Sequence, residues 1–194
     1  MTRRGRLLTV LAVTLVGSAI VGSALSRSNG DGGPEVRIGA PGTYDQPGGG
    51  IPTAPPLAGD QLPDLAAKTL AGADVTLRGL IGQPLVINIW YSACVPCAKE
   101  LPEFAKVQKE LGDQVRFVGL NVQDGPDKAE KFAHDAGVGY EILLTPYKNV
   151  IDALEIQTTP STLFIDATGR IVELHSSQLD AATLRSLISE KLGV

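Results

Sequence analysis

Residues 85–97 read Leu-Val-Ile-Asn-Ile-Trp-Tyr-Ser-Ala-Cys-Val-Pro-Cys, and this stretch decides the fold. Its first seven residues are nearly all apolar and rich in β-branched side chains, which is typical of a strand buried on both faces of a sheet. Residues 98–111 then carry apolar side chains at helical spacing, and Gly112 ends that run. We therefore expect a buried strand, a turn that holds two cysteines, and a helix that begins at those cysteines.

The rest of the chain alternates between strand and helix patterns. The other expected elements are short extended pieces at 64–77, a second buried strand at 115–121, a helix from 124 to about 136, a short helical piece at 149–154, a hairpin at 161–174 and a closing helix at 180–192. This order predicts one α/β domain with a mixed central sheet flanked by helices.

The chemistry is expected at Cys94 and Cys97, the only two cysteines of the chain. A helix N-terminus presents free N–H groups and the positive end of the helix dipole, so it stabilises a thiolate and lowers its pKa. Pro96 fixes the backbone at the entry turn and removes one donor. We expect Cys94 to be the exposed thiol that attacks a disulfide. Cys97, one turn into the helix, should be shielded and should resolve the mixed disulfide.

Other uses of two cysteines fit less well. A tetrahedral zinc site needs about four ligands. His134 and His175 are isolated and far apart in the sequence, so we expect them to be ordinary histidines and not zinc ligands. Haem attachment requires a histidine directly after the second cysteine, where this chain has Ala98. A purely structural disulfide remains open, although so short a ring adds little stability. We expect neither a metal nor a cofactor.

Four segments carry a resemblance to a known family: residues 85–90, residues 94–97, Glu100-Leu-Pro102 and the stretch from Thr159-Pro160 to Asp166. Together they resemble the thioredoxin fold and, more narrowly, the membrane-tethered TlpA/ResA-like thiol-disulfide oxidoreductases of bacteria. The resemblance covers about residues 55–194 and implies a thioredoxin-like domain there. It also implies that residues 124–154 form a helix-containing insertion after the second core strand.

The resemblance implies roles for further residues. The proline that matches Pro160 is cis in the thioredoxin fold and faces the cysteines, which leaves the backbone beside it free to pair with a substrate chain. A glutamate at the place of Glu100 lies near the cysteines in ResA-like proteins and affects their reactivity, because a partly buried carboxyl group can hold or relay a thiol proton. A solvated helix charge at Glu100 and an ordinary strand-start proline at Pro160 are the alternatives. Asn88 stands where thioredoxins have a buried aspartate.

We expect the substrate chain to meet Trp90, Tyr91, Pro96 and Thr159 around the cysteines. Relatives often have a tryptophan just before the first cysteine, where this chain has Ala93, so Tyr91 is expected to supply the aromatic surface. Trp90 is also explained without any function, as a residue that fills the core.

The N-terminal part of the chain has the order of an export signal. Three arginines precede the uncharged residues 7–25, which as a helix would reach roughly 28 Å, close to the hydrocarbon thickness of a membrane. Residues 1–25 are therefore a signal peptide or a signal-anchor, and small residues at 22–24 leave cleavage open. Residues 26–54 are rich in Gly and Pro and predict a flexible tether. The domain at 55–194 is then expected outside the cytoplasmic membrane, tethered to it or secreted.

Composition excludes some partners. The net charge of −4 becomes −7 when the three N-terminal arginines are set aside, and aromatic residues make up only 5%. Nucleic-acid binding is therefore not expected.

The resemblance implies an exported enzyme that reduces disulfides in extracytoplasmic proteins, for example at the haem-binding cysteines of apocytochromes c. Its electrons would come from a membrane thiol-disulfide carrier. A disulfide-forming oxidase uses the same residues and remains an alternative, as does a copper-binding delivery module. A peroxide-reducing enzyme would need a threonine where this chain has Tyr91.

Overall fold

The computed structural model describes residues 57–194. The expected signal at 1–25 and the expected tether at 26–54 lie outside the described residues. Within residues 57–194, no helix combines the length and the apolar character that a membrane crossing requires.

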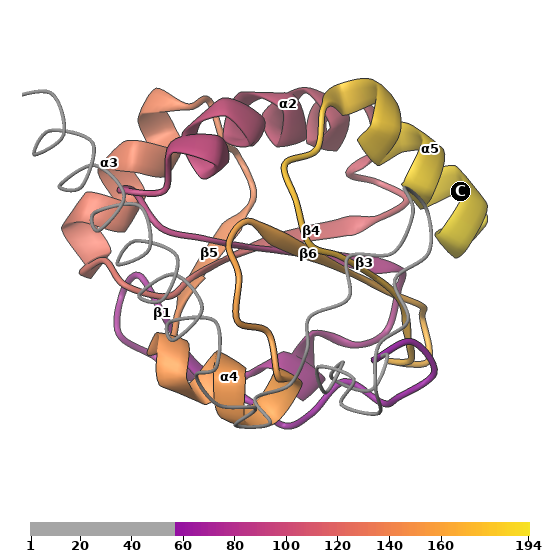
Figure 1. Cartoon of the computed structure of the whole chain (residues 1–194), viewed down its shortest axis with the longest axis horizontal. Helices are drawn as coiled ribbons and strands as arrows, with labels where there is room; N and C mark the ends of the chain where they lie inside the picture. Colours follow the sequence, from indigo (N-terminus) through magenta and orange to yellow (C-terminus); the bar gives the residue numbers. More distant parts are fainter. Residues whose placement is uncertain (1–56) are drawn as a thin grey trace, which may run out of the picture. The chain divides into compact units, whose positions relative to one another are not determined.

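A seven-stranded mixed sheet forms the centre of the domain, in the order β2-β1-β5-β4-β3-β6-β7 (Figure 1). The strands are β1 (Ala66–Thr69), β2 (Asp74–Thr76), β3 (Leu85–Trp90), β4 (Arg116–Asn121), β5 (Glu141–Leu144), β6 (Ser161–Ile165) and β7 (Ile171–His175). Strands β3, β4 and β5 are parallel, whereas β6 and β7 on one side and β1 and β2 on the other pair antiparallel. The expected mixed sheet is confirmed.

Helices cover both faces of this sheet. They are the 3-10 helix η1 (Leu77–Leu80), α2 (Val95–Leu111), α3 (Pro126–Asp135), α4 (Tyr147–Leu154) and α5 (Ala181–Leu192). Helices α2, α3 and α5 lie on one face, and α4 lies on the other (Figure 1). The central strands are therefore shielded from water on both sides.

The composition of β3 follows from this shielding. All six of its residues are buried. Ile87 and Ile89 pack into the cluster on the α4 side, whereas Val86 packs into the cluster beneath α2 and α5. Each fully buried aliphatic side chain contributes about 1.5–3 kcal/mol to the free energy of folding. Because both faces of β3 are buried, apolar side chains are favourable at consecutive positions and not only at alternate ones.

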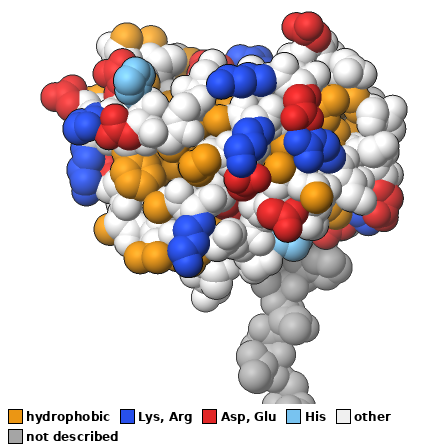
Figure 2. Space-filling view, turned by 90° about the horizontal axis from the view of Figure 1, so that it is seen from above, with side chains coloured by type: hydrophobic (Ala, Val, Ile, Leu, Met, Phe, Trp, Pro, Cys, Tyr) orange, Lys and Arg blue, Asp and Glu red, His pale blue; other side chains and the backbone are white. Residues whose placement is uncertain are grey.

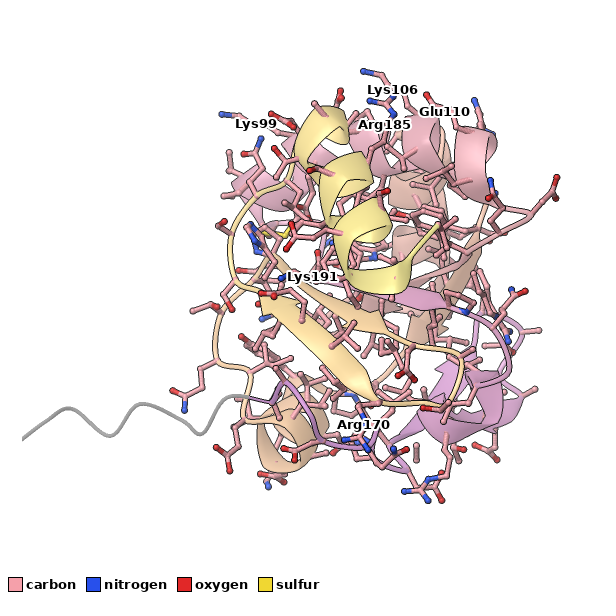
Figure 3. All side chains as sticks on the ribbon, turned by 90° about the vertical axis from the view of Figure 1, so that its right-hand side faces the viewer. Lys99, Lys106, Glu110, Arg170, Arg185 and Lys191 are labelled. Atoms are coloured by element: carbon pink, nitrogen blue, oxygen red, sulfur yellow. A yellow bond between two sulfur atoms is a disulfide. The ribbon has the colours of Figure 1, made fainter. Side chains whose placement is uncertain are left out.

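Helix α5 packs beside α2 over the sheet. Phe104 of α2 and Leu184 of α5 belong to one buried cluster, together with Phe164 of β6. At the surface, Arg185 donates two hydrogen bonds to the carboxylate of Glu110, over 2.6 and 2.7 Å (Figure 3). Seen from the α2 side, acidic and basic side chains are interspersed on this face (Figure 2).

The insertion differs in one respect from its expected content. Residues 124–154 contain α3 and α4, and they also contain β5, which the sequence patterns did not predict. Strand β5 lies between β4 and β1, inside the sheet. It has only four residues, which is too short for a periodic pattern to distinguish it from a loop.

Candidate active site

Cys94 and Cys97 lie at the junction of β3 and α2 and form a disulfide, with their Cα atoms 5.2 Å apart. Strand β3 ends at Trp90, and the backbone N–H of Cys94 donates to the carbonyl of Tyr91 over 3.1 Å, which closes the turn. Cys94 is the N-cap of α2, and its Sγ accepts a hydrogen bond from the backbone N–H of Cys97 over 3.2 Å. A free N–H at the start of the helix therefore points at this sulfur, as the sequence predicted.

The exposure of the two cysteines corrects one expectation. Cys94 is only 4% exposed and Cys97 is fully buried, so in the disulfide form Cys94 is not the exposed residue that we expected. Its neighbours on the chain, Ala93, Val95 and Pro96, are exposed, and Val95 is 67% exposed although it is apolar. The surface that a protein substrate would meet is therefore made by the turn around Cys94.

A buried carboxylate supports this turn from below. Asp124, three residues after the end of β4, accepts hydrogen bonds from the backbone N–H and the hydroxyl of Ser92 over 2.7 and 2.6 Å. It also accepts one from Asn121, and it pairs with Lys128 over 2.8 Å. Burial raises the pKa of Asp124, but the bonds from Lys128, Ser92 and Asn121 outweigh burial and hold this pKa well below its usual range.

Ser92 and Asp124 are not among the site residues predicted from the sequence. A signal for Asp124 exists, because polar residues in the loops that follow parallel strands gather at the same sheet edge, where ligands bind. Asp124 follows β4 as the cysteine turn follows β3, and the two strands pair in parallel.

Glu100 lies one helical turn after Cys97 and is fully buried. Its Oε1 accepts a hydrogen bond from Nδ2 of Asn88 on β3 over 2.6 Å, and its Oε2 accepts one from the backbone N–H of Leu179 over 3.1 Å. Burial raises the pKa of Glu100 from 4.5 to about 7, because the two hydrogen bonds only partly offset the loss of solvation. Glu100 is therefore not a solvated helix charge, and its protonation changes near neutral pH.

The peptide bond between Thr159 and Pro160 is cis. Strand β6 begins at the next residue, Ser161, which is paired with Ile89 near the end of β3. Thr159 and Pro160 therefore lie at the sheet edge to which the cysteine turn belongs. Pro160 is buried, whereas Thr159 is partly exposed.

Of the four residues expected to meet a substrate, one is placed in the core. The side chain of Trp90 has no exposed surface, belongs to the same buried cluster as the two cysteines, and stacks on Phe132 with ring centroids 5.7 Å apart. In the disulfide form the Trp90 side chain therefore fills the core and offers no exposed surface to a partner. Tyr91 is partly exposed and Pro96 is exposed, so both remain open to a partner chain.

Neither histidine is placed at the cysteines. His134 lies on α3 and is exposed, and His175 ends β7, where its Nε2 is 2.7 Å from the hydroxyl of Ser177. Within residues 57–194, no group of three or more His, Cys, Asp or Glu side chains is arranged to hold a metal ion.

Comparison with known proteins agrees with this geometry. The model of the AhpC/TSA family matches residues 58–174. The chain is 31% identical over 120 residues to thiol-disulfide oxidoreductase ResA of Halalkalibacterium halodurans, covering 61% of this chain and 68% of that protein. It is 31% identical over 121 residues to the thioredoxin-like protein YneN of Bacillus subtilis, covering 60% and 70%.

A solved structure shows the same architecture. A DsbF homologue from Corynebacterium diphtheriae superposes with a TM-score of 0.59 at 25% identity, covering 68% of this chain and 87% of that one. The expected thioredoxin-like fold is thereby confirmed. The ResA relative is named for thiol-disulfide exchange, which is the chemistry that the Cys94–Cys97 pair allows. This chain therefore belongs to the AhpC/TSA family, and it is a thiol-disulfide oxidoreductase.

Proposed function

We propose that this enzyme reduces disulfide bonds in proteins outside the cytoplasmic membrane, and that residues 1–25 direct it there. The observation that carries the proposal is the pair formed by Cys94 at the N-cap of α2 and the buried Glu100 further along the same helix. The helix N-terminus favours a thiolate on Cys94, and a carboxyl group with a pKa of about 7 can take up or release a proton at neutral pH.

In the first step, the Cys94 thiolate attacks one sulfur of a substrate disulfide. A bond forms between Cys94 and that sulfur, the substrate S–S bond breaks, and the other substrate sulfur leaves as a thiolate that takes a proton. In the second step, Cys97 loses its proton to Glu100 and attacks Cys94. The bond between Cys94 and the substrate sulfur breaks as the Cys94–Cys97 disulfide forms. That sulfur leaves as a thiolate that takes a proton, so two electrons pass from the enzyme to the substrate.

The remaining residues position the substrate in this scheme. Tyr91 and Pro96 would contact the substrate chain beside the cysteine turn, and Thr159, next to Pro160, would offer its backbone for pairing. A membrane thiol-disulfide carrier would then reduce the Cys94–Cys97 disulfide and return the enzyme to its starting state. The resemblance to ResA-like proteins supports the haem-binding cysteines of apocytochromes c as substrates.

Two serine variants test the chemistry. Cys94→Ser should abolish reduction of a model protein disulfide such as insulin, because the attacking sulfur is lost. Cys97→Ser should instead accumulate a mixed disulfide between Cys94 and the substrate, visible on a non-reducing gel. Ala98→Ser, at an exposed position in the same helical turn, is the matched control and should retain turnover. Turnover that survives in Cys94→Ser would refute the proposed attack.

The direction of the reaction is tested by the reduction potential. A value near about −250 mV or below supports the reductase, whereas a value near about −120 mV would favour a disulfide-forming oxidase. Incubation of Cys97→Ser with membranes that contain apocytochrome c tests the substrate, because a reductase of this protein should be trapped on it.

The location is tested on cells that express the full chain. Protease is added to cells whose cell envelope outside the cytoplasmic membrane has been removed and whose cytoplasmic membrane is intact. It should digest the domain, whereas a cytoplasmic marker protein should survive. A domain that stays protected until the membrane is lysed would contradict the proposed location.

A further inference from the structure

Four buried side-chain polar atoms have no hydrogen-bond partner within the described part of the chain. This group, here called the polar cluster, consists of Asn88 Oδ1, Trp90 Nε1, Tyr140 Oη and Thr162 Oγ1. Buried polar groups in proteins are nearly always paired, with protein or with ordered water. The polar cluster therefore requires a physical explanation.

The members of the polar cluster are gathered on one face of the sheet. In the strand register, Thr162 lies beside Asn88 and Asn88 lies beside Gly119, so these three positions form a row. Trp90 is two residues after Asn88 on the same strand and points to the same face. A Cβ built at Gly119 would lie 2.8 Å from Trp90 Nε1 and 3.3 Å from the ring of Tyr140. The indole nitrogen and the phenol ring thus both lie over Gly119.

Glu100 lies above this row. Asn88, whose Oδ1 belongs to the polar cluster, donates from its Nδ2 to the carboxylate of Glu100 over 2.6 Å. The charge of Glu100 also acts on Tyr140: burial raises the pKa of this phenol, and the nearby carboxylate raises it further. The carboxyl group proposed to handle the thiol proton is therefore next to the unpaired groups.

The energetic cost argues against a dry cluster. Each buried polar group without a partner loses its hydration with nothing in return. Four such losses together would be comparable to the whole free energy of unfolding of a typical domain. A buried water makes about three hydrogen bonds to otherwise unpaired groups and would remove most of this cost.

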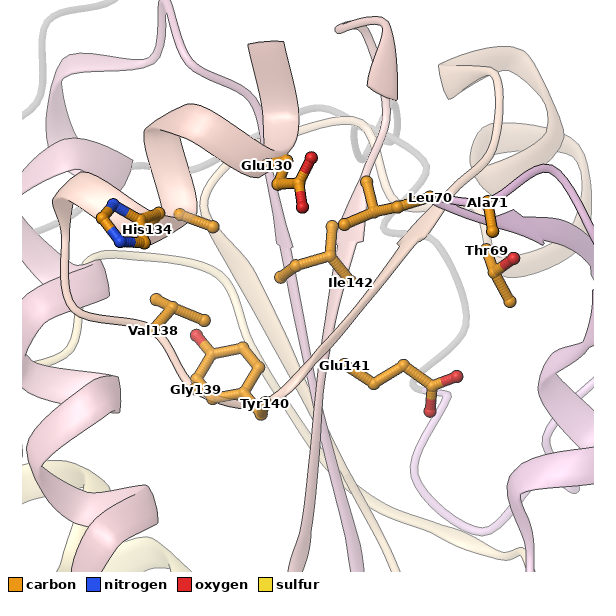
Figure 4. Close-up of a pocket in the computed structure, with 11 residues that line it drawn as sticks. Thr69, Leu70, Ala71, Glu130, His134, Val138, Gly139, Tyr140, Glu141 and Ile142 are labelled. Atoms are coloured by element: carbon orange, nitrogen blue, oxygen red, sulfur yellow. The ribbon is translucent and has the colours of Figure 1, made fainter. Parts of the chain in front are cut away.

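Tyr140 connects the cluster with the outside. Tyr140 is partly exposed as a residue, and it lines a pocket of about 430 Å³ with Glu130 and His134 of α3 (Figure 4). Its hydroxyl oxygen is buried. The residues that line the pocket come from α3, from β5 with the residues before it, and from the end of β1 with the residues after it, and none of them belongs to the cysteine turn. Tyr140 is thus shared by the lining of the pocket and the polar cluster.

We propose that the polar cluster binds ordered water, and that this water, with the hydroxyl of Tyr140, forms the path by which Glu100 exchanges its proton with solvent. Glu100 passes its proton to the water, and the oxygen of Tyr140 accepts a proton from that water. The phenol gives its own proton to a water molecule of the pocket when the side chain turns its hydroxyl toward the pocket, so the phenol stays neutral. The path rests on the role of Glu100 in the proposed function, whereas the hydration site does not.

The experiment uses the full chain in detergent micelles with ¹⁵N-labelled tryptophan. Because Trp90 is the only tryptophan, the indole N–H gives a single NMR signal. We expect a cross-peak between this signal and long-lived water, and a shift of the signal with pH whose midpoint lies near 7 and which is lost in Glu100→Gln. Thr162→Val removes one member of the cluster and should weaken or abolish the water cross-peak. A wild-type protein without this cross-peak would overturn the hydration site.

Tyr140→Phe tests the path. At the midpoint of the titration, the wild-type signal should be a single averaged line, because proton exchange is fast. In Tyr140→Phe, we expect two separate lines for the protonated and ionised forms, since exchange is slowed. Tyr147→Phe, on α4 across the sheet, is the matched control and should behave as the wild type. An averaged line in folded Tyr140→Phe would overturn the path.

These outcomes separate this proposal from the proposed function. A wild-type protein that shows the water cross-peak and the averaged line but reduces no protein disulfide would refute the proposed function and support the hydration site. If Tyr140→Phe does not fold, the same line-shape measurement on Thr162→Val tests the path. This variant removes a ligand of the water, and an averaged line together with a lost water cross-peak would overturn the path.

Discussion

Nδ2 of Asn88 lies 2.6 Å from Oε1 of Glu100, and this hydrogen bond joins the middle of strand β3 to helix α2 one turn beyond Cys97. Both residues are buried, Asn88 to 1% and Glu100 to 0% exposure. The amide of Asn88 does not ionise, so Glu100 is the one group in this contact whose charge changes with pH. The pKa of Glu100 therefore depends on the folded state, in which the carboxyl group is buried and bonded to Asn88.

The first prediction concerns stability as a function of pH. The pKa of Glu100 is raised in the folded protein from 4.5 to about 7, so between these values the folded state binds more protons than the unfolded state. The free energy of unfolding should therefore fall as pH rises through this window, by about 3 kcal/mol from this group. In Glu100→Gln this slope should be missing. Urea unfolding of the oxidised proteins at several pH values measures the difference.

Oxidised protein is the appropriate sample, because the cysteines in the disulfide do not titrate. Glu103→Gln is the control: Glu103 lies on the same helix, its pKa is lowered by Lys106, and its variant should keep the wild-type slope above pH 5. A Glu100→Gln protein whose stability changes with pH as the wild type does would show that the carboxyl group is not perturbed by burial.

The second prediction concerns Asp124, which holds the backbone and the hydroxyl of Ser92 two residues before Cys94. Asp124→Asn removes the charge and places an amide N–H against donors, so we expect a loss of about 1.5–3 kcal/mol in the free energy of unfolding at pH 7. The turn that carries Cys94 should also lose its fixed position, which a slower attack on a disulfide substrate would report.

The pH dependence of this effect has the opposite sign to that of Glu100. The pKa of Asp124 is lowered in the folded protein, so its contribution is present above the unfolded value and is lost as pH falls through the folded one. The difference in the free energy of unfolding between the wild type and Asp124→Asn should be constant near neutral pH and should become smaller at acid pH. Asp127→Asn, at an exposed acid in the first turn of α3, should leave both stability and attack rate unchanged. An equal loss of stability and of attack rate in Asp124→Asn and Asp127→Asn would contradict a specific role for Asp124.

The third prediction concerns Gly119, the position in β4 over which Trp90 lies. A Cβ at Gly119 would lie 2.7 Å from Ile142 Cδ1 and 2.8 Å from Trp90 Nε1, closer than such contacts allow. We expect Gly119→Ala to cost about 1–3 kcal/mol, because the ring and the Ile142 side chain must both shift. Gly139→Ala, where the nearest atom beyond the chain neighbours is 3.7 Å away, is the control. Thermal unfolding compares the two, and equal melting temperatures would show that the ring moves without cost.

The sequence predicted well those features that depend on local pattern. The run at 85–91 contains a strand buried on both faces, and the cysteine pair forms the N-terminus of α2, because a long apolar run and a Pro after an N-cap position each have one main structural meaning. Long-range contacts were harder. Nothing in the spacing between Ser92 and Asp124 shows that they touch, since they are brought together by the parallel pairing of β3 with β4.

The placement of Trp90 shows the same limit. Its position four residues before Cys94 suggested a wall of the substrate site, but strand alternation alone does not show which side chains a helix will cover. Helix α3, contributed by the insertion, brings Phe132 onto the indole ring, and Trp90 has no exposed surface in the disulfide form. The resemblance to ResA-like proteins implied that Glu100 is partly buried. The helical spacing alone did not distinguish this from a solvent-exposed charge on the helix.

The fourth prediction uses the buried Trp90 as a reporter of the redox state. Trp90 belongs to the same buried cluster as Cys94 and Cys97, and it is the single tryptophan of the chain. A disulfide in contact with an excited indole quenches its fluorescence by accepting an electron, whereas two thiols quench it less. Reduction with dithiothreitol should therefore raise the emission intensity, and reoxidation should restore the quenched value. In Cys94→Ser no disulfide can form, so its emission should be independent of the reductant. A wild-type emission that does not respond to reduction would place the indole too far from the disulfide and contradict the packing described for the site.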